Sequence, residues 1–224
     1  AVIAELGAWQ RLPRLVKFGS WVGGDMDGNP DVTAKSIRET LGRQRSLALD
    51  LYYDECRKLA RDLSQDESRV GVSDELRQQS SLYAGHFPEA ANSVPARHRG
   101  MPYRCFLRLI GARLQATYDD AAFPYESPEE LIADLELIAS SLRANKGTHA
   151  GLFAVQRLLR RARTFGFHIA TIDVRQNALV HRRVIGEALQ EPSWLAMTSA
   201  DRTKRLDEAL ERRESYIGTL SSGA

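Results

Sequence analysis

Apolar residues recur every three or four positions through most of the chain, a spacing that predicts amphipathic α-helices. Ser73 and Ser127 are expected N-caps, and Gly147 is the expected terminator of the helix that begins after Ser127. Helices are predicted at 34–63, 74–85, 102–119, 128–146, 149–164 and 178–189, with further helix to about 215, and residues 1–13 are expected to be the last turns of a helix. The Pro, Asn, His and Gly content of 87–100 predicts a loop.

The period changes at 167–176, FHIATIDVRQ, where residues alternate as in a β-strand. Both faces of the alternation are largely apolar, so we expect a strand buried on both sides. His168 falls on one of these apolar faces and is expected to be packed. A second short strand is predicted in RLVKFGSW, 14–21. Two-sided strands separated by helices are typical of a parallel sheet or barrel. The expected fold is predominantly α-helical: a partial (β/α)8 TIM-barrel segment with about two short parallel strands and long helices between them.

The stretch KFGSWVGGDMDGNPDVT concentrates Trp21, four glycines and three carboxylates directly after the first predicted strand. Gly23 and Gly24 allow a positive φ or a close backbone approach, and DGNP is a common turn sequence. A simple reversal of the chain therefore explains about half of this stretch. The spacing does not fit an EF-hand, which would need Gly at Pro30 and Glu at Ser36, and no Gly-Lys-Ser/Thr follows for a Walker-type phosphate loop. The carboxylates can instead accept hydrogen bonds from backbone donors and hold the loop.

Arg175 lies at the C-terminal end of the second predicted strand, as Trp21 does at the end of the first. In a β/α barrel this is the end at which ligands bind. Two interpretations stay open: Asp173, two residues back on the same face, neutralises Arg175 in a structural ion pair, or the planar guanidinium binds a phosphate or carboxylate. The five histidines show no ligand spacing, and none is assigned a catalytic role.

Composition narrows the function classes. Of 224 residues, 43% are apolar, which is enough for a core, and the formal charge of +2 provides no strong field for nucleic acid or an anionic membrane. We find no run of eighteen apolar residues and no leader pattern, so neither a membrane span nor a signal peptide is expected. Cys56 and Cys105 form neither a disulfide framework nor a metal site, which fits a reducing, cytoplasmic setting.

The motifs FGSWVGGDMDGNPDVT and RRARTFGFHIATIDVRQNALVHRRVI, in this order and spacing, strongly resemble phosphoenolpyruvate carboxylase. The similarity runs from about Leu12 to Leu189, and the family usually has Arg where this chain has Met26. We interpret 1–224 as one internal fragment of the barrel domain. Its expected parts are a strand and loop at about 14–30, a helical insertion at 33–165, a strand at 167–176 and helices at 178–215.

The resemblance implies that the full-length parent forms oxaloacetate and phosphate from phosphoenolpyruvate and bicarbonate. It further implies that Arg175 contacts the phosphoryl-bearing substrate and is the catalytic residue carried by this chain, and that Trp21 lines the apolar pocket around the methylene group and carbon dioxide. Loop support is assigned to Gly23, Gly24, Asp25, Asp27 and Asn29. The family's magnesium or manganese ligands are expected outside this chain, and no metal site is assigned within it. The parent is expected to be an allosteric, cytoplasmic homotetramer, and this chain alone is expected to be inactive.

Two alternatives remain from the sequence. The chain could be a catalytically silent helical interaction module, with Met26 as a sign of lost chemistry, or a free-standing domain that binds a phosphate ligand through Arg175.

Overall fold

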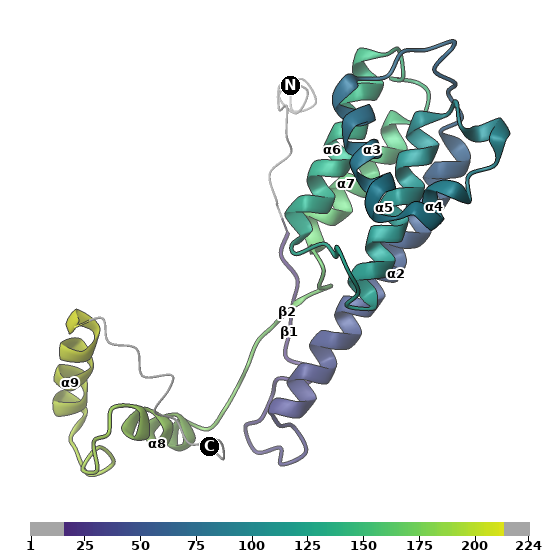
Figure 1. Ribbon diagram of the computed structural model, residues 1–224. Helices are drawn as coiled ribbons and strands as arrows, with labels where there is room; N and C mark the ends of the chain where they lie inside the picture. The colour runs from purple at the N-terminus through teal and green to yellow at the C-terminus, as the bar shows by residue number, and fades with distance from the viewer. Residues whose placement is uncertain (1–15, 213–224) are drawn as a thin grey trace, which may run out of the picture. The chain divides into compact units, whose positions relative to one another are not determined.

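The computed structural model describes residues 16–212, and within them the chain is mostly helical (Figure 1). Its contacts divide it into two compact units. Within the described residues, we call 16–20 and 38–171 the helical unit, and 21–37 and 172–212 the loop unit. The α-helices are α2 (Ala34–Asp62), α3 (Asp74–His86), α4 (Pro88–Asn92), α5 (Pro102–Tyr118), α6 (Pro128–Ala144), α7 (Leu152–Phe165), α8 (Ala178–Ala188) and α9 (Ser199–Arg212).

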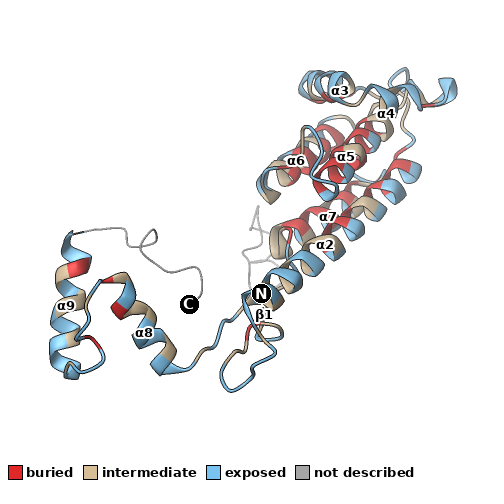
Figure 2. Ribbon diagram, turned by 60° about the horizontal axis from the view of Figure 1, so that its bottom comes forward, coloured by how far each residue is buried: buried red, intermediate tan, exposed pale blue. Residues whose placement is uncertain are grey.

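The helical unit is a bundle with its own apolar core. α6 packs along α7, and α3 and α4 pack against α5. Buried positions follow the inward faces of α2, α3, α5, α6 and α7, as the periodicity of the sequence predicts, whereas α4 has no buried residue (Figure 2). The side chains of Tyr52, Phe106, Leu131 and Val155 are at most 1% exposed. Burial of aromatic and branched side chains therefore supplies the main stabilisation of this unit.

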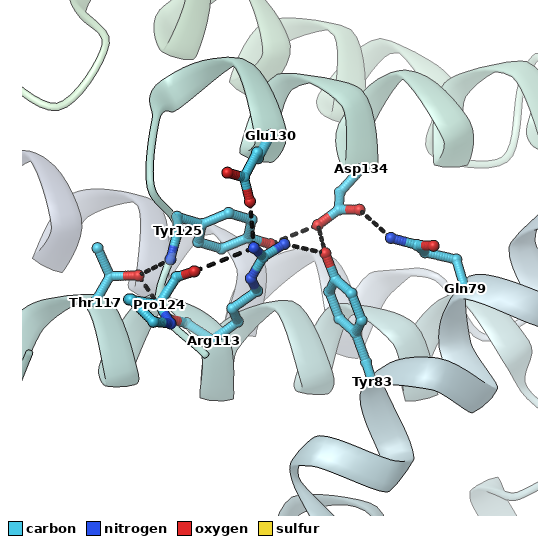
Figure 3. Close-up of polar contacts among 8 residues, drawn as sticks. All are labelled: Gln79, Tyr83, Arg113, Thr117, Pro124, Tyr125, Glu130 and Asp134. Atoms are coloured by element: carbon cyan, nitrogen blue, oxygen red, sulfur yellow. Dashed lines mark hydrogen bonds and ion pairs between the residues drawn. The ribbon is translucent and has the colours of Figure 1, made fainter. Parts of the chain in front are cut away.

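A polar cluster is enclosed in the same core (Figure 3). Asp134 accepts hydrogen bonds from the hydroxyls of Tyr125 at 2.6 Å and Tyr83 at 2.8 Å, and both hydroxyls are buried. Arg113 donates to the Tyr83 hydroxyl, to Glu130 and to the Pro124 carbonyl, and its guanidinium lies 4.1 Å from the ring centre of Tyr125. A buried charge costs stability unless it is paired and hydrogen-bonded. Arg113 is paired with Glu130, but its Nε is buried without a hydrogen-bond partner among the described residues.

Several helix boundaries differ in detail from the predictions. The region 87–100, predicted as a loop, contains α4 and a single 3-10 turn at Ala96–His98. Ser73 and Ser127 occupy the N-cap positions of α3 and α6, but neither side chain accepts a capping hydrogen bond. At the end of α6 the left-handed residue is Lys146, with φ of 61°, while the N–H of Gly147 donates to the Leu142 carbonyl at 2.6 Å. The helix end predicted at 1–13 lies outside the described residues.

The two strands are confirmed as short and parallel, but they are shorter than predicted. β1 is Gly19–Ser20 and β2 is Thr171–Ile172, and they pair in one open sheet. The prediction of two-sided burial for 167–176 was wrong for this chain, because His168 and most residues after it are exposed. Phe167 alone in that range is buried. Alternating apolar residues become buried only when other elements cover both faces, and the described residues cover little of this segment.

The loop unit has only a small core. α8 and α9 enclose a cluster of Leu189, Trp194 and Ala209, with Ile185, Met197 and Leu206 packed against it. Asn177 is the N-cap of α8, and its side-chain oxygen accepts the N–H of Leu179 at 2.9 Å. No helix between residues 16 and 212 combines the length and the apolar character needed to cross a bilayer.

Candidate functional site

A tight turn follows β1 and places the glycine-rich loop beside the segment that follows β2. The N–H groups of Gly24 and Asp25 both donate to the Trp21 carbonyl, at 2.8 and 3.1 Å. Gly23 has φ of 80°, a conformation that glycine adopts without the strain a side chain brings. A Cβ on Gly24 would lie 2.6 Å from Ile172 Cγ2 and 2.7 Å from the Asp173 carbonyl oxygen. Both glycines are therefore required by the backbone, the first by its conformation and the second by close packing.

Backbone pairing resumes between Asp25 and Arg175 in an isolated parallel bridge. The Arg175 N–H donates to the Gly24 carbonyl at 2.9 Å, and the Met26 N–H donates to the Arg175 carbonyl at 2.8 Å. These bonds fix the loop and the strand end in one register within the loop unit. Residues 25 and 175 consequently face each other across the bridge.

The side chain of Arg175 lies between an aromatic ring and a carboxylate. Its Cζ is 5.3 Å from the centre of the Trp21 ring, within the range of a cation–π contact. Its Nη1 is 3.7 Å from Asp25 Oδ2. The side chains of Arg175 and Asp25 are 51% and 40% exposed, so the pair is open to solvent and to a ligand. Trp21 and Arg175, singled out separately in the sequence, are thus neighbours.

The structure corrects the partner expected for Arg175. Asp173 was the candidate for a neutralising ion pair, but the carboxylate that pairs with Arg175 is that of Asp25, from the glycine-rich loop. The reason is register: the bridge sets Asp25 opposite Arg175, whereas Asp173 is an exposed residue whose carbonyl packs near Gly24. Sequence reasoning missed this pairing because it depends on how two distant segments align.

The remaining loop residues have smaller roles. Asn29, rather than a carboxylate, accepts a backbone hydrogen bond, from the N–H of Asp31 at 3.1 Å, in a local turn. Asp27 is exposed. Met26 is half-buried, and its sulfur lies 3.9 Å from Gln176 Nε2 in a weak hydrogen bond. Asp25 Oδ1 is buried and has no hydrogen-bond partner among the described residues.

A hollow of about 520 Å³ lies on the helical unit between α2, α4 and α5. Its lining is basic and includes Arg57, Arg104 and His98. Arg104 is already engaged, because it donates to the carbonyls of Ala60 at 2.6 Å and Arg61 at 2.8 Å at the end of α2. Burial and the nearby arginines lower the pKa of His98. Neither Trp21 nor Arg175 lines this hollow, so it is separate from the site that the sequence motifs predict.

Residues 4–221 match the family model described as phosphoenolpyruvate carboxylase. The chain belongs to the phosphoenolpyruvate carboxylase family. It is 51% identical over 202 residues to the phosphoenolpyruvate carboxylase of Xanthomonas euvesicatoria pv. vesicatoria, a match that covers 90% of this chain and 22% of that protein. The enzymes of Rhodopseudomonas palustris and Azoarcus sp. are 38% and 39% identical over 212 and 216 residues, covering 88% and 89% of this chain. The chain spans about 22% of the length of these carboxylases.

The planar guanidinium of Arg175 is of a kind that pairs with phosphate or carboxylate groups. Among residues 16–212 no group of three or more His, Cys, Asp or Glu side chains could hold a metal ion. The described site combines the Arg175 guanidinium, the Trp21 ring and the Asp25 carboxylate.

Proposed function

We propose that this chain supplies one side of the phosphoenolpyruvate pocket of a full-length phosphoenolpyruvate carboxylase, which forms oxaloacetate and phosphate from phosphoenolpyruvate and bicarbonate. The observation that supports this proposal is the placement of the Arg175 guanidinium 5.3 Å from the Trp21 ring, with half of its side chain exposed. A cation and an apolar surface side by side match a substrate that has a phosphate at one end and a methylene group at the other.

Each residue then has a distinct task. In this proposal Arg175 hydrogen-bonds the phosphoryl group and favours the negative charge that develops as the group is transferred to bicarbonate, which leaves the enolate. Trp21 covers the methylene carbon and keeps water from the enolate until carbon dioxide adds. Gly23 and Gly24 set the backbone, while Asp25, Asp27 and Asn29 support the loop.

The magnesium or manganese of the parent is part of the same proposal, with ligands from outside this chain. Among residues 16–212 the carboxylates of the glycine-rich loop do not fit a metal site, because that of Asp25 is paired with Arg175 and Asp27 is exposed. A cytoplasmic homotetramer is likewise proposed for the parent.

The role of Arg175 can be tested in the full-length parent with Arg175→Gln. Removing the charge that the transition state needs should lower kcat/KM for phosphoenolpyruvate by about 10²- to 10³-fold. Arg160→Gln is the matched control, since Arg160 is an exposed arginine of α7, and it should keep wild-type kinetics. Wild-type kinetics in Arg175→Gln would refute the proposal and favour a silent helical module.

The isolated chain is expected to form no oxaloacetate, because it contains only one side of the pocket. A coupled assay, in which malate dehydrogenase and NADH report oxaloacetate, measures this directly, and activity above the no-enzyme rate would contradict the expectation. Isothermal titration with phosphoenolpyruvate tests the alternative of a free-standing binder. Only that alternative predicts saturable heat, lost in Arg175→Gln, at millimolar ligand or below.

A further inference from the structure

Asp25 and Arg175 are joined at the level of the backbone before their side chains meet. Hydrogen bonds on both sides of the bridge, at 2.9 and 2.8 Å, hold residue 175 between the carbonyl of Gly24 and the N–H of Met26. A residue fixed in this way keeps a constant Cα position. The orientation of its long side chain, however, still has to be chosen among many rotamers.

Two contacts select that orientation. The Cζ of Arg175 lies over the Trp21 ring, 5.3 Å from its centre, and Asp25 Oδ2 lies 3.7 Å from Nη1. The aromatic contact restricts where the guanidinium lies, and the carboxylate attracts its Nη1 side. The other carboxylate oxygen, Asp25 Oδ1, is buried, so the carboxyl group itself has one enclosed edge and one edge toward Arg175.

We propose that Asp25 is a positioning residue, which holds the Arg175 guanidinium against Trp21 in the orientation that receives the phosphoryl group. This inference rests on the proposed function of Arg175 and extends it to a residue that does not touch substrate. The half-exposed pair contributes little to folding, because solvent screens the attraction between the two charges. Its value lies in orientation, because a catalytic group that is already aligned loses less entropy when substrate binds.

The test uses Asp25→Asn in the full-length parent, a change that keeps the shape of the side chain and removes its charge. We expect KM for phosphoenolpyruvate to rise about fivefold, the size of an exposed ion pair, with KM for bicarbonate unchanged. Asp31→Asn is the matched control, since it removes an exposed carboxylate near the same loop, and it should leave both constants unchanged. Asp25→Glu, which keeps the charge, should recover part of the loss.

A double-mutant cycle separates positioning from a general structural role. If Asp25 acts through Arg175, Asp25→Asn should have no further effect in the Arg175→Gln background. An equal loss in both backgrounds, or a change in both KM values together, would overturn the inference. Impaired Arg175→Gln with normal Asp25→Asn would also overturn it and leave the proposed function intact, whereas normal Arg175→Gln would remove the proposed function itself.

Discussion

The helical unit and the loop unit treat their charged groups in opposite ways. In the helical unit Arg113 is 8% exposed at its side chain and is enclosed with Asp134 by two tyrosines. In the loop unit Arg175 is 51% exposed and rests on one ring and one carboxylate. The enclosed arginine donates to three groups in the core, although its Nε has no hydrogen-bond partner among the described residues, whereas the half-exposed arginine is open to solvent. The main apolar core therefore lies in the helical unit, while the chemistry that we propose for Arg175 belongs to the loop unit.

We expect the largest effect on stability when a buried apolar side chain is removed from the helical unit. Phe106→Ala removes a completely buried ring from α5 and should lower the free energy of unfolding by about 3–5 kcal/mol, because a cavity remains. Phe153→Ala, in α7, removes a ring that is 74% exposed and should change it by no more than about 0.5 kcal/mol. Urea denaturation followed by circular dichroism measures both. Similar losses in the two variants would mean that the helical unit is not held by this core.

A methyl group added at Gly24 in the loop unit should lower the free energy of unfolding by less than the loss of a buried ring does. Gly24→Ala places a Cβ within 2.7 Å of the Asp173 carbonyl oxygen, and we expect a cost of about 1–3 kcal/mol as the backbone shifts. Because Gly24 O accepts the N–H of Arg175, the same shift should raise KM for phosphoenolpyruvate in the parent. Gly111→Ala, whose Cβ would meet Tyr53 carbons at an ordinary 3.6 Å, is the control and should be tolerated. Tolerance of Ala at both positions would contradict the close packing described here.

The same contrast explains how much could be predicted from the sequence. Helices such as α5 and α6 were located to within about two residues, since Pro, Gly and apolar spacing act locally. Trp21 and Arg175 were predicted at the C-terminal ends of two parallel strands, and their assignment to a substrate pocket stays a prediction. The Asp25 partner was missed because it depends on register between segments far apart in sequence. The Arg113 cluster was missed although Arg113 falls on the apolar face of its helix, a position that indicates a buried, paired charge.

The enclosed carboxylate of the helical unit predicts a dependence of stability on pH. Burial raises the pKa of Asp134 above its usual value, although the Tyr125 and Tyr83 hydroxyls donate to it. Above the ordinary aspartate pKa the unfolded chain has released a proton that the folded chain keeps, so the free energy of unfolding falls as the pH rises toward the raised pKa. The contribution is fully present only below the unfolded pKa.

Asp134→Asn should therefore lack this decline, while the exposed Glu126→Gln should retain it. Urea denaturation at intervals between about pH 3 and pH 7 compares the slopes with that of the wild type. An unchanged slope in Asp134→Asn would show that Asp134 titrates at its ordinary value despite its burial.

The smallest expected effect is a gain in stability from a substitution in the helical unit. Gly42 lies in the interior of α2, and a Cβ there would meet nothing within 4 Å. Gly42→Ala should raise the free energy of unfolding by about 0.5–1 kcal/mol, because alanine loses less backbone entropy than glycine when the helix forms. Gly85→Ala in α3, where the added methyl group also meets nothing, should give a gain of the same sign. Neither change should alter KM for phosphoenolpyruvate in the parent, since both positions lie in the helical unit. A changed KM would show that stability in the helical unit and substrate binding at Arg175 are not independent.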